Sequence, residues 1–499
     1  MHDSLDAARA SATIANQALP AGVSMPCYPR EILQSRIVHL GFGAFHRAHQ
    51  ALLTDRVLNA CGGDWGICET SMFSGEALMA ALRRQDHLYT VMEKSAQGNS
   101  LTVVGSVSES LHARLDGMEA IIEKLAEPQV AIVSLTITEK GYCLDRSTGA
   151  PDLQHPLIAG DLATPAQPQS APGVLVEALR RRRDRGLSPF TVLSCDNMPE
   201  NGEKIQAAVL GIAGLLSTDL AAWIADQVGF PNTMVDRIVP AATEQSLDEI
   251  AAALGVADPC AISCEPFIQW VVEDRFVAGR PAWEQAGVQF VNDVRPYEEM
   301  KLRMLNGSHS FLAWLGYLAG FAHISDCMQD SDFQAAAFRL MMSEQAPTLR
   351  VQEVNLDDYA AELLHRFANP ALLHRTWQIA MDGTQKLPQR LLDSVRWHIA
   401  RDSDYPCLTL GIAGWMRYVS AVDDAGAPIE IKDPLVDTLR NIVQNSADGE
   451  PRVKALLAVK SVFGEDLPAN EQFVDRVTAA YLLIKQRGAK AAVGKLHRP

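Results

Sequence analysis

Runs of β-branched and apolar residues alternate with helical stretches through the first part of this chain, and that alternation constrains its fold most. Strands are expected at residues 36–43, 64–72, 130–138 and 189–197. Helices are expected between or after them, at residues 45–60, 74–84 and 174–183. Strands that alternate with helices form a mostly parallel sheet with helices on both faces. The pattern therefore predicts an α/β domain of the Rossmann type.

The pattern changes after about residue 288, where helical periodicity replaces the alternation. Helices are expected at residues 297–320, 331–344, 356–367, 434–445 and 470–486. A chain of 499 residues is long enough for more than one domain. We therefore predict an N-terminal tail at residues 1–35, a dinucleotide-binding Rossmann domain at 36–290, and a predominantly α-helical substrate domain at 291–499.

Charge and cysteine usage narrow the class of protein. The net charge of −16 argues against nucleic acid or an anionic membrane surface as a partner. The first residues lack the continuous apolar stretch of a signal peptide, and no apolar run is long enough to cross a membrane. The nine cysteines are scattered without CxxC spacing, which is typical of reduced thiols. We expect a cytoplasmic monomer or homodimer that acts on a small molecule.

Gly41 and Gly43 stand where the first expected strand turns into the first expected helix. Glycine permits this turn and a helix N-terminus attracts a pyrophosphate, so the pair predicts a dinucleotide site, which also includes Phe45. The third glycine of the usual G-x-G-x-x-G pattern is replaced by His46. Glu69 comes 26 residues after Gly43, at the expected end of the second strand, where a carboxylate would hold ribose hydroxyls and repel a 2′-phosphate. We therefore predict NAD rather than NADP, with an exposed strand-end charge as the alternative interpretation of Glu69.

The two histidines of the FHRAH segment have a spacing that a metal site can use. His46 and His49 are three residues apart on the expected helix. No third ligand is suggested nearby in the sequence, and polar residues at a helix start often bond the backbone instead. We therefore predict no metal site.

The stretch YEEMKLRMLNGSHSF, at residues 297–311, is expected to form one helix. Residues of an α-helix advance by about 100° each, which places Asn306 roughly 140° and His309 roughly 80° from Lys301. Glu298 lies roughly 60° from Lys301 on the same scale. One face of an otherwise apolar segment then carries a lysine, an amide, an imidazole and a carboxylate. A buried ammonium without a task is costly, so this arrangement predicts a site.

Lys301 can act as a general base if burial lowers the pKa of its amine, as in catalytic lysines with pKa values near roughly 7–8. The neutral amine accepts the hydroxyl proton of an alcohol while a hydride leaves the carbinol carbon, and the protonated amine returns it in the reverse reaction. Asn306 and Asn197, the latter at a strand end, can donate hydrogen bonds to the developing alkoxide. His309 can orient a substrate hydroxyl. The alternatives are a lysine whose ammonium reaches solvent and a histidine buried in the core.

Six segments carry a resemblance to a known family. They are RIVHLGFGAFHRAHQA, SLTITEKGYC, SCDNMPENG, TMVDRIVPA, KLRMLNGSHSFLAWLGYL and RTWQIAMDGTQKLPQRLLD. From about Arg36 almost to the C-terminus, the chain resembles the polyol-specific long-chain dehydrogenases, which include mannitol 2-dehydrogenases, and most closely their fructuronate-reducing members. The K-x4-N-x2-H pattern and the SCDN segment are the specific parts of this match.

The resemblance implies a metal-independent, NAD-linked enzyme with a dinucleotide-binding N-terminal domain and a helical C-terminal domain. The catalytic roles that it implies fall on Lys301, on Asn197 and Asn306 as the oxyanion-hole amides, on His309, and on Glu139 as the group that gates proton exchange. It also implies that Asp236 binds the substrate.

A sugar acid carries a carboxylate that a polyol lacks, and a pocket for it should contain an arginine or a lysine. Lys386 and Arg390 are the candidates, with Arg375 behind them, and the alternative is that all three are surface charges. The resemblance implies interconversion of D-fructuronate and D-mannonate by hydride transfer with a lysine general acid/base. Two alternatives remain open, a mannitol or arabinitol 2-dehydrogenase and an NAD(H)-binding sensor without turnover.

Overall fold

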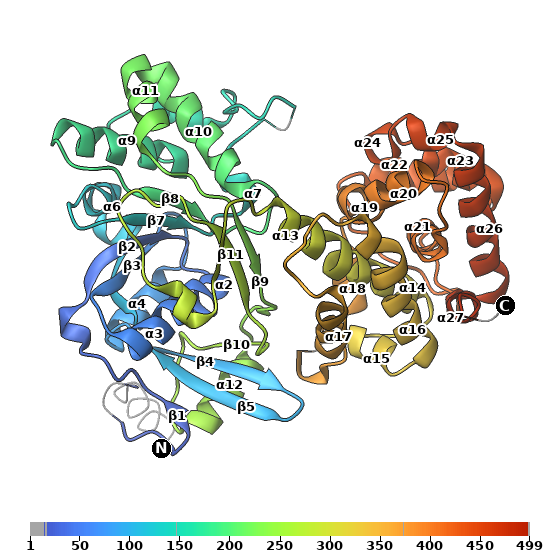
Figure 1. The fold of residues 1–499 in the computed structure, drawn as a ribbon, viewed down its shortest axis with the longest axis horizontal. Coiled ribbons are helices and arrows are strands. Elements are labelled where there is room, and N and C mark those ends of the chain that lie inside the picture. The colour runs from blue at the N-terminus through green and yellow to red at the C-terminus, as the bar shows by residue number, and fades with distance from the viewer. Residues whose placement is uncertain (1–13, 15–16, 146, 373, 498–499) are drawn as a thin grey trace. The chain divides into compact units, whose positions relative to one another are not determined.

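The computed structural model describes residue 14 and residues 17–145, 147–372 and 374–497 of the chain. Contacts divide the chain into two compact units, one that ends at Arg295 and one that begins at Pro296. Figure 1 shows the sheets in the first unit and helices throughout the second. The division falls a few residues after the boundary expected near residue 290.

A five-stranded sheet forms the centre of the first unit. Its strands follow the order β6 (Val107–His112), β3 (Trp65–Ser71), β2 (Gln34–Leu40), β7 (Ile132–Leu135) and β8 (Thr191–Ser194). Every neighbouring pair is parallel. The sequence leads to this arrangement because the short apolar runs of β7 and β8 are buried on both faces, as strands of a covered parallel sheet are.

Helices cover both faces of this sheet: α3 (Gln50–Cys61), α4 (Glu76–Arg84), α6 (Met118–Leu125), α9 (Ala171–Asp184) and α10 (Asn201–Leu216). Alternate strand residues point to opposite faces. Val38 and Val133 pack in one core with α6, α9 and α10, whereas Ile37 and Ile132 pack in another with α3 and α4. The predicted Rossmann-type α/β domain is therefore confirmed.

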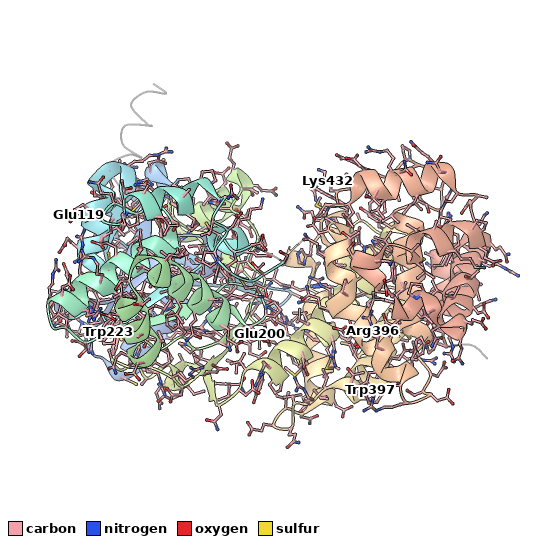
Figure 2. The ribbon with its side chains drawn as sticks, turned by 90° about the horizontal axis from the view of Figure 1, so that it is seen from above. Glu119, Glu200, Trp223, Arg396, Trp397 and Lys432 are labelled. Carbon is pink, nitrogen blue, oxygen red and sulfur yellow. The ribbon has the colours of Figure 1, made fainter. Side chains whose placement is uncertain are left out.

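Charged side chains connect the outer faces of two of these helices. Arg181 of α9 donates hydrogen bonds to Glu119 and Glu123 of α6 at 2.6 and 2.5 Å, and to Glu177 of α9 at 2.8 Å. Figure 2 shows Glu119 at the outer margin of the first unit. The pairs with the exposed carboxylates of Glu119 and Glu123 contribute at most about 1 kcal/mol each, so the buried faces of the helices dominate the packing.

Two smaller sheets of the first unit were not predicted. One has the strands β1 (Val23–Ser24), β5 (Gly98–Val104), β4 (Tyr89–Ser95) and β10 (Ile262–Cys264), and the other β12 (Gln289–Val291), β11 (Gln269–Glu273) and β9 (Thr233–Asp236). Most of these strands have five residues or fewer, and the hairpin of β4 and β5 ends in exposed polar residues. Short strands of this kind depend on their partners rather than on a pattern of their own.

The predicted N-terminal tail is not loose where the structure describes it. The side chain of Ile14 is buried in a small cluster with Leu88 and Val103. Val23 pairs with Leu101 in β5. The hydroxyl of Tyr28 donates a 2.5 Å hydrogen bond to a buried aspartate of α3. Docking contacts of this kind are not visible in the composition of the segment.

The helix expected at residues 45–60 is interrupted. Helix α2 (Ala44–Arg47) ends after one turn and α3 begins at Gln50. Between them, His49 leaves the helical conformation, its Nε2 lies 3.2 Å from the carbonyl of Gln269, and its ring contacts Trp270. The tertiary contact of His49 therefore overrides the helical pattern.

The second unit is helical. Its principal helices are α13 (Arg295–Met300), α14 (Ser308–Leu318), α16 (Ser331–Arg339), α17 (Leu356–Phe367), α21 (Pro406–Tyr418), α22 (Val436–Asn445) and α26 (Glu471–Arg487). The buried helices α14 and α21 approach closely because Gly411 lies against Phe311 and Gly414 against Leu315. Within the described residues, none of the helices combines the length and the apolar character needed to span a bilayer.

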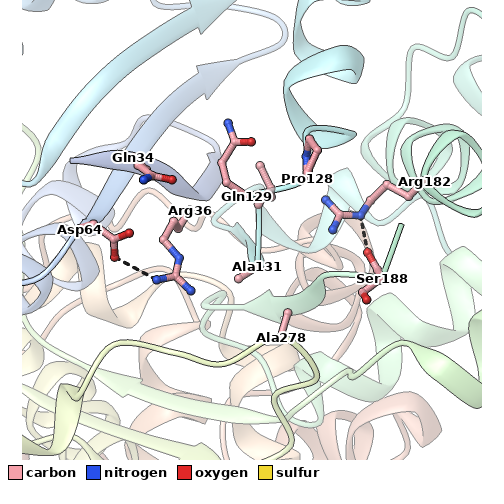
Figure 3. Close-up of a pocket in the computed structure, with 10 residues that line it drawn as sticks. Gln34, Arg36, Asp64, Pro128, Gln129, Ala131, Arg182, Ser188 and Ala278 are labelled. Carbon is pink, nitrogen blue, oxygen red and sulfur yellow. Dashed lines mark hydrogen bonds and ion pairs between the residues drawn. The ribbon is translucent and has the colours of Figure 1, made fainter. Parts of the chain in front are cut away.

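A polar cavity of about 310 Å³ opens at the amino-terminal ends of β2, β7 and β8. Figure 3 shows Arg36 paired with Asp64 on one side of it, and Arg182 bonded to the carbonyl of Ser188 on the other. Ligands of parallel α/β sheets bind at the opposite, carboxyl edge. A reaction site is therefore expected at the other end of these strands.

Candidate active site

The turn after β2 has a geometry that requires glycine. Gly41 has φ +111°, and a Cβ built on it would lie 2.3 Å from the carbonyl oxygen of Thr136. The Thr136 hydroxyl donates a 2.9 Å hydrogen bond to the carbonyl of Gly41. Gly43 then provides the N-cap of α2. The turn is thus compact, rigid and free of side chains, which fits the close approach of a dinucleotide pyrophosphate.

The ring of Phe45, which was predicted to belong to the cofactor site, stacks on a neighbouring histidine. Its centroid lies 4.7 Å from that of His49 at an interplanar angle of 21°. Phe45 is half-buried and packs against the core of the first unit. The contact fixes the first residues after the glycine turn, and a role of Phe45 in cofactor binding stays a prediction.

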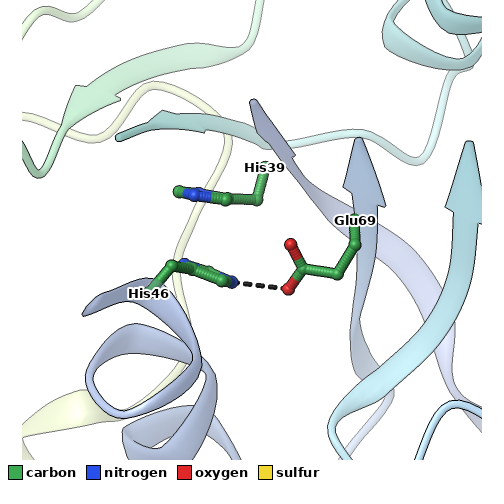
Figure 4. A group of neighbouring side chains, drawn as sticks. All are labelled: His39, His46 and Glu69. Atoms are coloured by element: carbon green, nitrogen blue, oxygen red, sulfur yellow. Dashed lines mark hydrogen bonds and ion pairs between the residues drawn. The ribbon is translucent and has the colours of Figure 1, made fainter. Parts of the chain in front are cut away.

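Glu69 is not at the end of its strand, contrary to the prediction. β3 continues to Ser71, and the Glu69 side chain is 0% exposed. Its carboxylate lies 2.6 Å from Nε2 of His46 (Figure 4). Burial raises the pKa of Glu69 to about 7 and lowers that of His46 to about 3. A ribose can reach only an accessible carboxylate, so this burial disagrees with the predicted contact and with the interpretation as an exposed charge.

His39 completes a buried cluster with these two residues. Its ring stacks on that of His46 with centroids 3.4 Å apart and planes 12° apart (Figure 4). Candidate ligand atoms of His39, His46 and Glu69 lie within 4.8 Å of one another. However, nearly parallel stacked rings direct their nitrogen lone pairs along parallel planes rather than toward one point. The arrangement therefore fits a hydrogen-bonded cluster better than a coordination sphere.

The nitrogens of His39 have partners in this cluster. Nδ1 lies 2.7 Å from the hydroxyl of Ser134, and Nε2 lies 2.8 Å from that of Thr136 and 3.0 Å from the carbonyl of Gly41. His49 takes no part, although the sequence suggested a spacing with His46. Burial lowers the pKa of His39 well below its ordinary value. The imidazole that bonds the glycine turn is therefore neutral.

Three predicted site residues of the first unit lie at or beyond the carboxyl ends of strands. Glu139 is in the single-turn helix α7 (Thr138–Gly141) after β7, and Asn197 follows β8 closely. Asp236 is the last residue of β9 and is 4% exposed. The carboxyl ends of β7 and β8 share one edge of the five-stranded sheet, where the glycine turn after β2 also lies. Glu139 and Asn197 thus follow strands that end at the edge expected for a ligand, whereas β9, which ends with Asp236, belongs to a separate sheet and pairs antiparallel with β11.

Lys301 is buried in the second unit, with 6% of its surface exposed. It opens a π-helical segment, Lys301–Gly307, in place of the α-helix expected from the sequence. A π-helix closes i→i+5 hydrogen bonds, so residues five apart stack along its axis. The separation of roughly 140° expected on an α-helix between Lys301 and Asn306 is therefore wrong. The wider turn brings these two residues toward the same side.

His309 is 7% exposed and lies one turn further on, at the start of α14. Its ring packs against those of Phe367 and His374, with centroids 4.5 and 5.3 Å away. Burial lowers the pKa of His309 well below its ordinary value, and the positive charges of Arg366 and Arg390 act in the same direction. The imidazole is therefore neutral. His374 and Arg366 were not predicted, because they reach His309 from distant segments without a spacing signal.

Two of the three predicted carboxylate-binding cations lie beside this region. Arg390 donates hydrogen bonds from one terminal nitrogen to the carbonyl of Asn306 at 3.2 Å and to the hydroxyl of Ser310 at 3.0 Å. Its buried Nε finds no hydrogen-bond partner within the described part of the chain. Burial lowers the pKa of Arg390 to about 10. The guanidinium therefore retains donor capacity that no carboxylate of the described residues satisfies at ion-pair distance.

Lys386 and Arg375 differ in their surroundings. The amine of Lys386 donates hydrogen bonds to the carbonyls of Ile379 and Met381 at 2.9 and 2.5 Å. Burial and the neighbouring Arg390 lower the pKa of Lys386 to about 8. Arg375, in contrast, is exposed as the N-cap residue of α18 (Thr376–Ala380). The interpretation as a surface charge therefore holds for Arg375 and not for the other two.

Comparison with known proteins covers nearly the whole chain. The model of the mannitol dehydrogenase Rossmann domain matches residues 35–285, and that of the mannitol dehydrogenase C-terminal domain matches residues 293–485. An uncharacterized Escherichia coli oxidoreductase, YeiQ, is 66% identical over 96% of this chain and 98% of its own. The D-mannonate oxidoreductase of Escherichia coli is 54% identical over 97% of this chain and 100% of its own.

A solved structure also matches nearly the whole chain. The mannitol 2-dehydrogenase of Pseudomonas fluorescens, in a ternary complex with NAD and D-mannitol, is 38% identical and has a TM-score of 0.83. The match covers 96% of this chain and 98% of that one. A likeness of this extent includes both units of the molecule.

Proposed function

This chain belongs to the mannitol dehydrogenase family, and from that premise we propose that it is the member that interconverts D-fructuronate and D-mannonate. It is an NAD-dependent oxidoreductase, as the family and its Rossmann domain indicate. The proposal adds the substrate and the lysine mechanism. It is supported by the identity of 54% with a D-mannonate oxidoreductase across the whole of both chains.

The observation that carries the choice of substrate is the positive charge beside Asn306. Arg390 contacts the backbone of Asn306, and Lys386 is close enough to lower the pKa of His309 together with Arg390. Arg390 is half-buried and forms no ion pair with a carboxylate of the described residues, which is costly for a desolvated guanidinium, and a substrate carboxylate would compensate it through charge-assisted hydrogen bonds. A polyol such as mannitol offers no such charge. The cluster therefore favours a sugar acid.

Lys301 would act as the general acid and base. Bound at the glycine turn through Gly41 and Gly43, NAD would accept or return the hydride of the carbinol carbon. In the oxidation of mannonate, the neutral amine of Lys301 takes the hydroxyl proton, and the alcohol becomes a ketone. In the reduction of fructuronate, the same group gives the proton back. Only 6% of the Lys301 surface is exposed, and burial in general disfavours the charged form of an amine.

Amides and a neutral imidazole would prepare the reacting oxygen. Asn306 and Asn197 donate hydrogen bonds to the developing alkoxide, and such donors are worth about 3–4 kcal/mol in comparable sites. The π-helical turn supports this role for Asn306, because it moves the amide toward the side of Lys301. His309 orients a second hydroxyl, Glu139 carries the proton to solvent, and Asp236 binds a hydroxyl of the substrate.

One observation favours a second candidate, a polyol 2-dehydrogenase. The structural relative that contains D-mannitol covers 96% of this chain with a TM-score of 0.83. The two candidates share the proposed chemistry at Lys301. They differ in the substrate group that Arg390 would bind, which is a carboxylate in the sugar acid and is absent from the polyol.

The deciding experiment measures NADH oxidation with D-fructuronate and with D-fructose under the same conditions. We expect kcat/KM for fructuronate to exceed that for fructose at least tenfold, which corresponds to about 1.4 kcal/mol, as one charge-assisted hydrogen bond would provide. A preference for fructose would contradict the uronate proposal and favour the polyol dehydrogenase.

A further inference from the structure

We propose that Asp196 is a positioning residue that fixes the segment carrying Glu139 relative to Asn197, an inference that rests on the proposed function. Asp196 immediately precedes Asn197 in the chain and is 7% exposed. It is the third residue of the SCDN segment, and no role of its own was predicted for it from the sequence. Its contacts, which lie entirely within the first unit, assign it this role.

The carboxylate of Asp196 binds the beginning of the segment that carries Glu139. One oxygen accepts a 2.8 Å hydrogen bond from the backbone N–H of Thr138, and the other accepts one of 3.2 Å from that of Ile137. Both donors precede Glu139 directly. A buried carboxylate that accepts from two successive backbone amides fixes the direction in which the next residues leave the strand.

The hydroxyl of Tyr142 closes the other end of the same segment. It donates a 2.9 Å hydrogen bond to Asp196 and lies 2.5 Å from the hydroxyl of Ser194 in β8. Tyr142 itself is 0% exposed. Glu139 thus lies on a single helical turn, α7, whose two ends are both attached to Asp196.

The attachment opposes a backbone strain. Thr138 has φ +64°, in the left-handed region that β-branched residues rarely adopt. Such a conformation costs of order 1–3 kcal/mol and persists only where the surroundings hold it in place. The hydrogen bond from Thr138 to Asp196 acts directly on the strained residue. Loss of the carboxylate would therefore let Thr138 relax and would turn Glu139 with it.

The backbone of Asp196 is fixed in turn from the other side. The side chain of Asn201 donates hydrogen bonds of 3.0 Å to the carbonyls of Asp196 and of Thr233, and it accepts one of 2.9 Å from the N–H of Thr233. Thr233 opens β9, the strand that ends with Asp236. Asp196 is therefore the point at which the segments of Glu139, Asn197 and Asp236 are connected.

The test is the substitution Asp196→Asn, which keeps the volume but faces the two backbone amides with one acceptor and one donor. A misplacement of about 1 Å can cost roughly 10²-fold in rate, so we expect kcat to fall about 10–100-fold. The Kd for NAD should stay within about twofold, because the glycine turn is held by His39 and Thr136 instead. Hydrogen exchange at the amides of Ile137 and Thr138 should accelerate.

A matched control is available in the same unit. Asp161 is 1% exposed and accepts hydrogen bonds from the backbone amides of Gln169 and Ser170 at 2.6 and 3.1 Å, neither of which is a predicted site residue. Asp161→Asn imposes the same chemical change on a carboxylate with the same kind of partners. We expect it to lower thermal stability similarly and to leave kcat within about twofold.

A third variant, Glu139→Gln, separates the inference from the function on which it rests. The inference is supported if Glu139→Gln and Asp196→Asn both lower kcat and alter its pH profile, with losses that do not add in the double variant. It is overturned, with the proposed function intact, if Glu139→Gln lowers kcat while Asp196→Asn behaves like Asp161→Asn. If Glu139→Gln leaves kcat unchanged, both the inference and the proposed proton path are contradicted.

Discussion

The two units of this enzyme position their functional groups by different means. In the first unit, the groups stand on turns at the carboxyl ends of strands, and buried polar side chains such as His39 and Asp196 hold those turns. In the second, Lys301, Asn306 and His309 belong to one continuous helical stretch, whose geometry is altered by a π-helical segment. Changes at the glycine turn of the first unit should therefore affect cofactor binding, changes around Asp196 should affect the position of Glu139, and changes in the second unit should affect proton transfer at Lys301 and substrate choice.

The largest effect is expected for Lys301→Ala in the second unit. Loss of the proposed general acid/base should lower kcat about 10²–10⁴-fold, the usual contribution of such a group. The Kd for NAD, measured by fluorescence titration, should change less than about threefold. A variant that loses NAD affinity along with turnover would contradict the division of roles between the two units, because Lys301 would then have a role in cofactor binding.

The counterpart in the first unit is Gly41→Ala. The new methyl group would lie 2.3 Å from the carbonyl oxygen of Thr136 at φ +111°, so the turn must move. We expect the Kd for NAD to rise about 10–100-fold and the free energy of unfolding to fall by roughly 1–3 kcal/mol. Gly43→Ala is the control, because its Cβ would meet nothing closer than 3.8 Å. It should weaken NAD binding without loss of stability, and equal destabilisation by both variants would contradict the account of this turn.

The substitution Arg390→Met tests the substrate specificity assigned to the second unit. Loss of a hydrogen bond to a charged group costs about 1.5–3 kcal/mol, so the KM for fructuronate should rise about 10–100-fold while that for fructose stays nearly constant. Arg375→Met removes the same charge from an exposed position and should have little effect on either. An equal rise in KM for fructuronate and fructose would show that Arg390 supports the helix through Asn306 and Ser310 and does not bind the substrate carboxylate.

The smallest effect concerns stability and pH in the second unit. Burial raises the pKa of Glu344 to about 6 from an ordinary value of 4.5. The folded state therefore binds the proton more tightly, and stability should fall as pH rises from 4.5 to 6, by up to about 2 kcal/mol. Urea unfolding of wild type and Glu344→Gln across this window should show a difference in the free energy of unfolding that changes by up to about 2 kcal/mol, because the variant lacks only this contribution. In the first unit, the opposite shifts of Glu69 and His46 should largely cancel over the same range.

The parts of the fold that follow from a repeated local pattern were predictable. The parallel sheet follows from apolar runs spaced by helices, and α17 (Leu356–Phe367) has the bounds that its periodicity gives, since Asn355 caps its N-terminus. The short strands around β11 have no such pattern and form through their neighbours. The interruption at His49 likewise depends on Gln269 and Trp270, which are distant in the chain.

The candidate site divides in the same way. Spacing identified Lys301, Asn306 and His309 as neighbours on one helix, but it could not reveal the π-helical turn. Gly307, at the end of that turn, leaves little space for a side chain, because a Cβ built on it would lie 3.0 Å from the carbonyl oxygen of Arg390 and from the amide nitrogen of Gln345, which come from other segments. The position predicted for Glu69 from spacing was also wrong, because the place of a residue along a strand does not reveal which buried side chain lies beside it.

Chemical rescue of Lys301→Ala by added primary amines tests the central claim most directly, since it asks whether a neutral amine is the missing proton acceptor. We expect methylamine to restore mannonate oxidation, with a rate that rises with the concentration of the free base, while acetate at the same ionic strength has no effect. An absence of rescue, together with a variant whose pH profile of kcat/KM matches that of the wild type, would contradict the assignment of Lys301 as the general base.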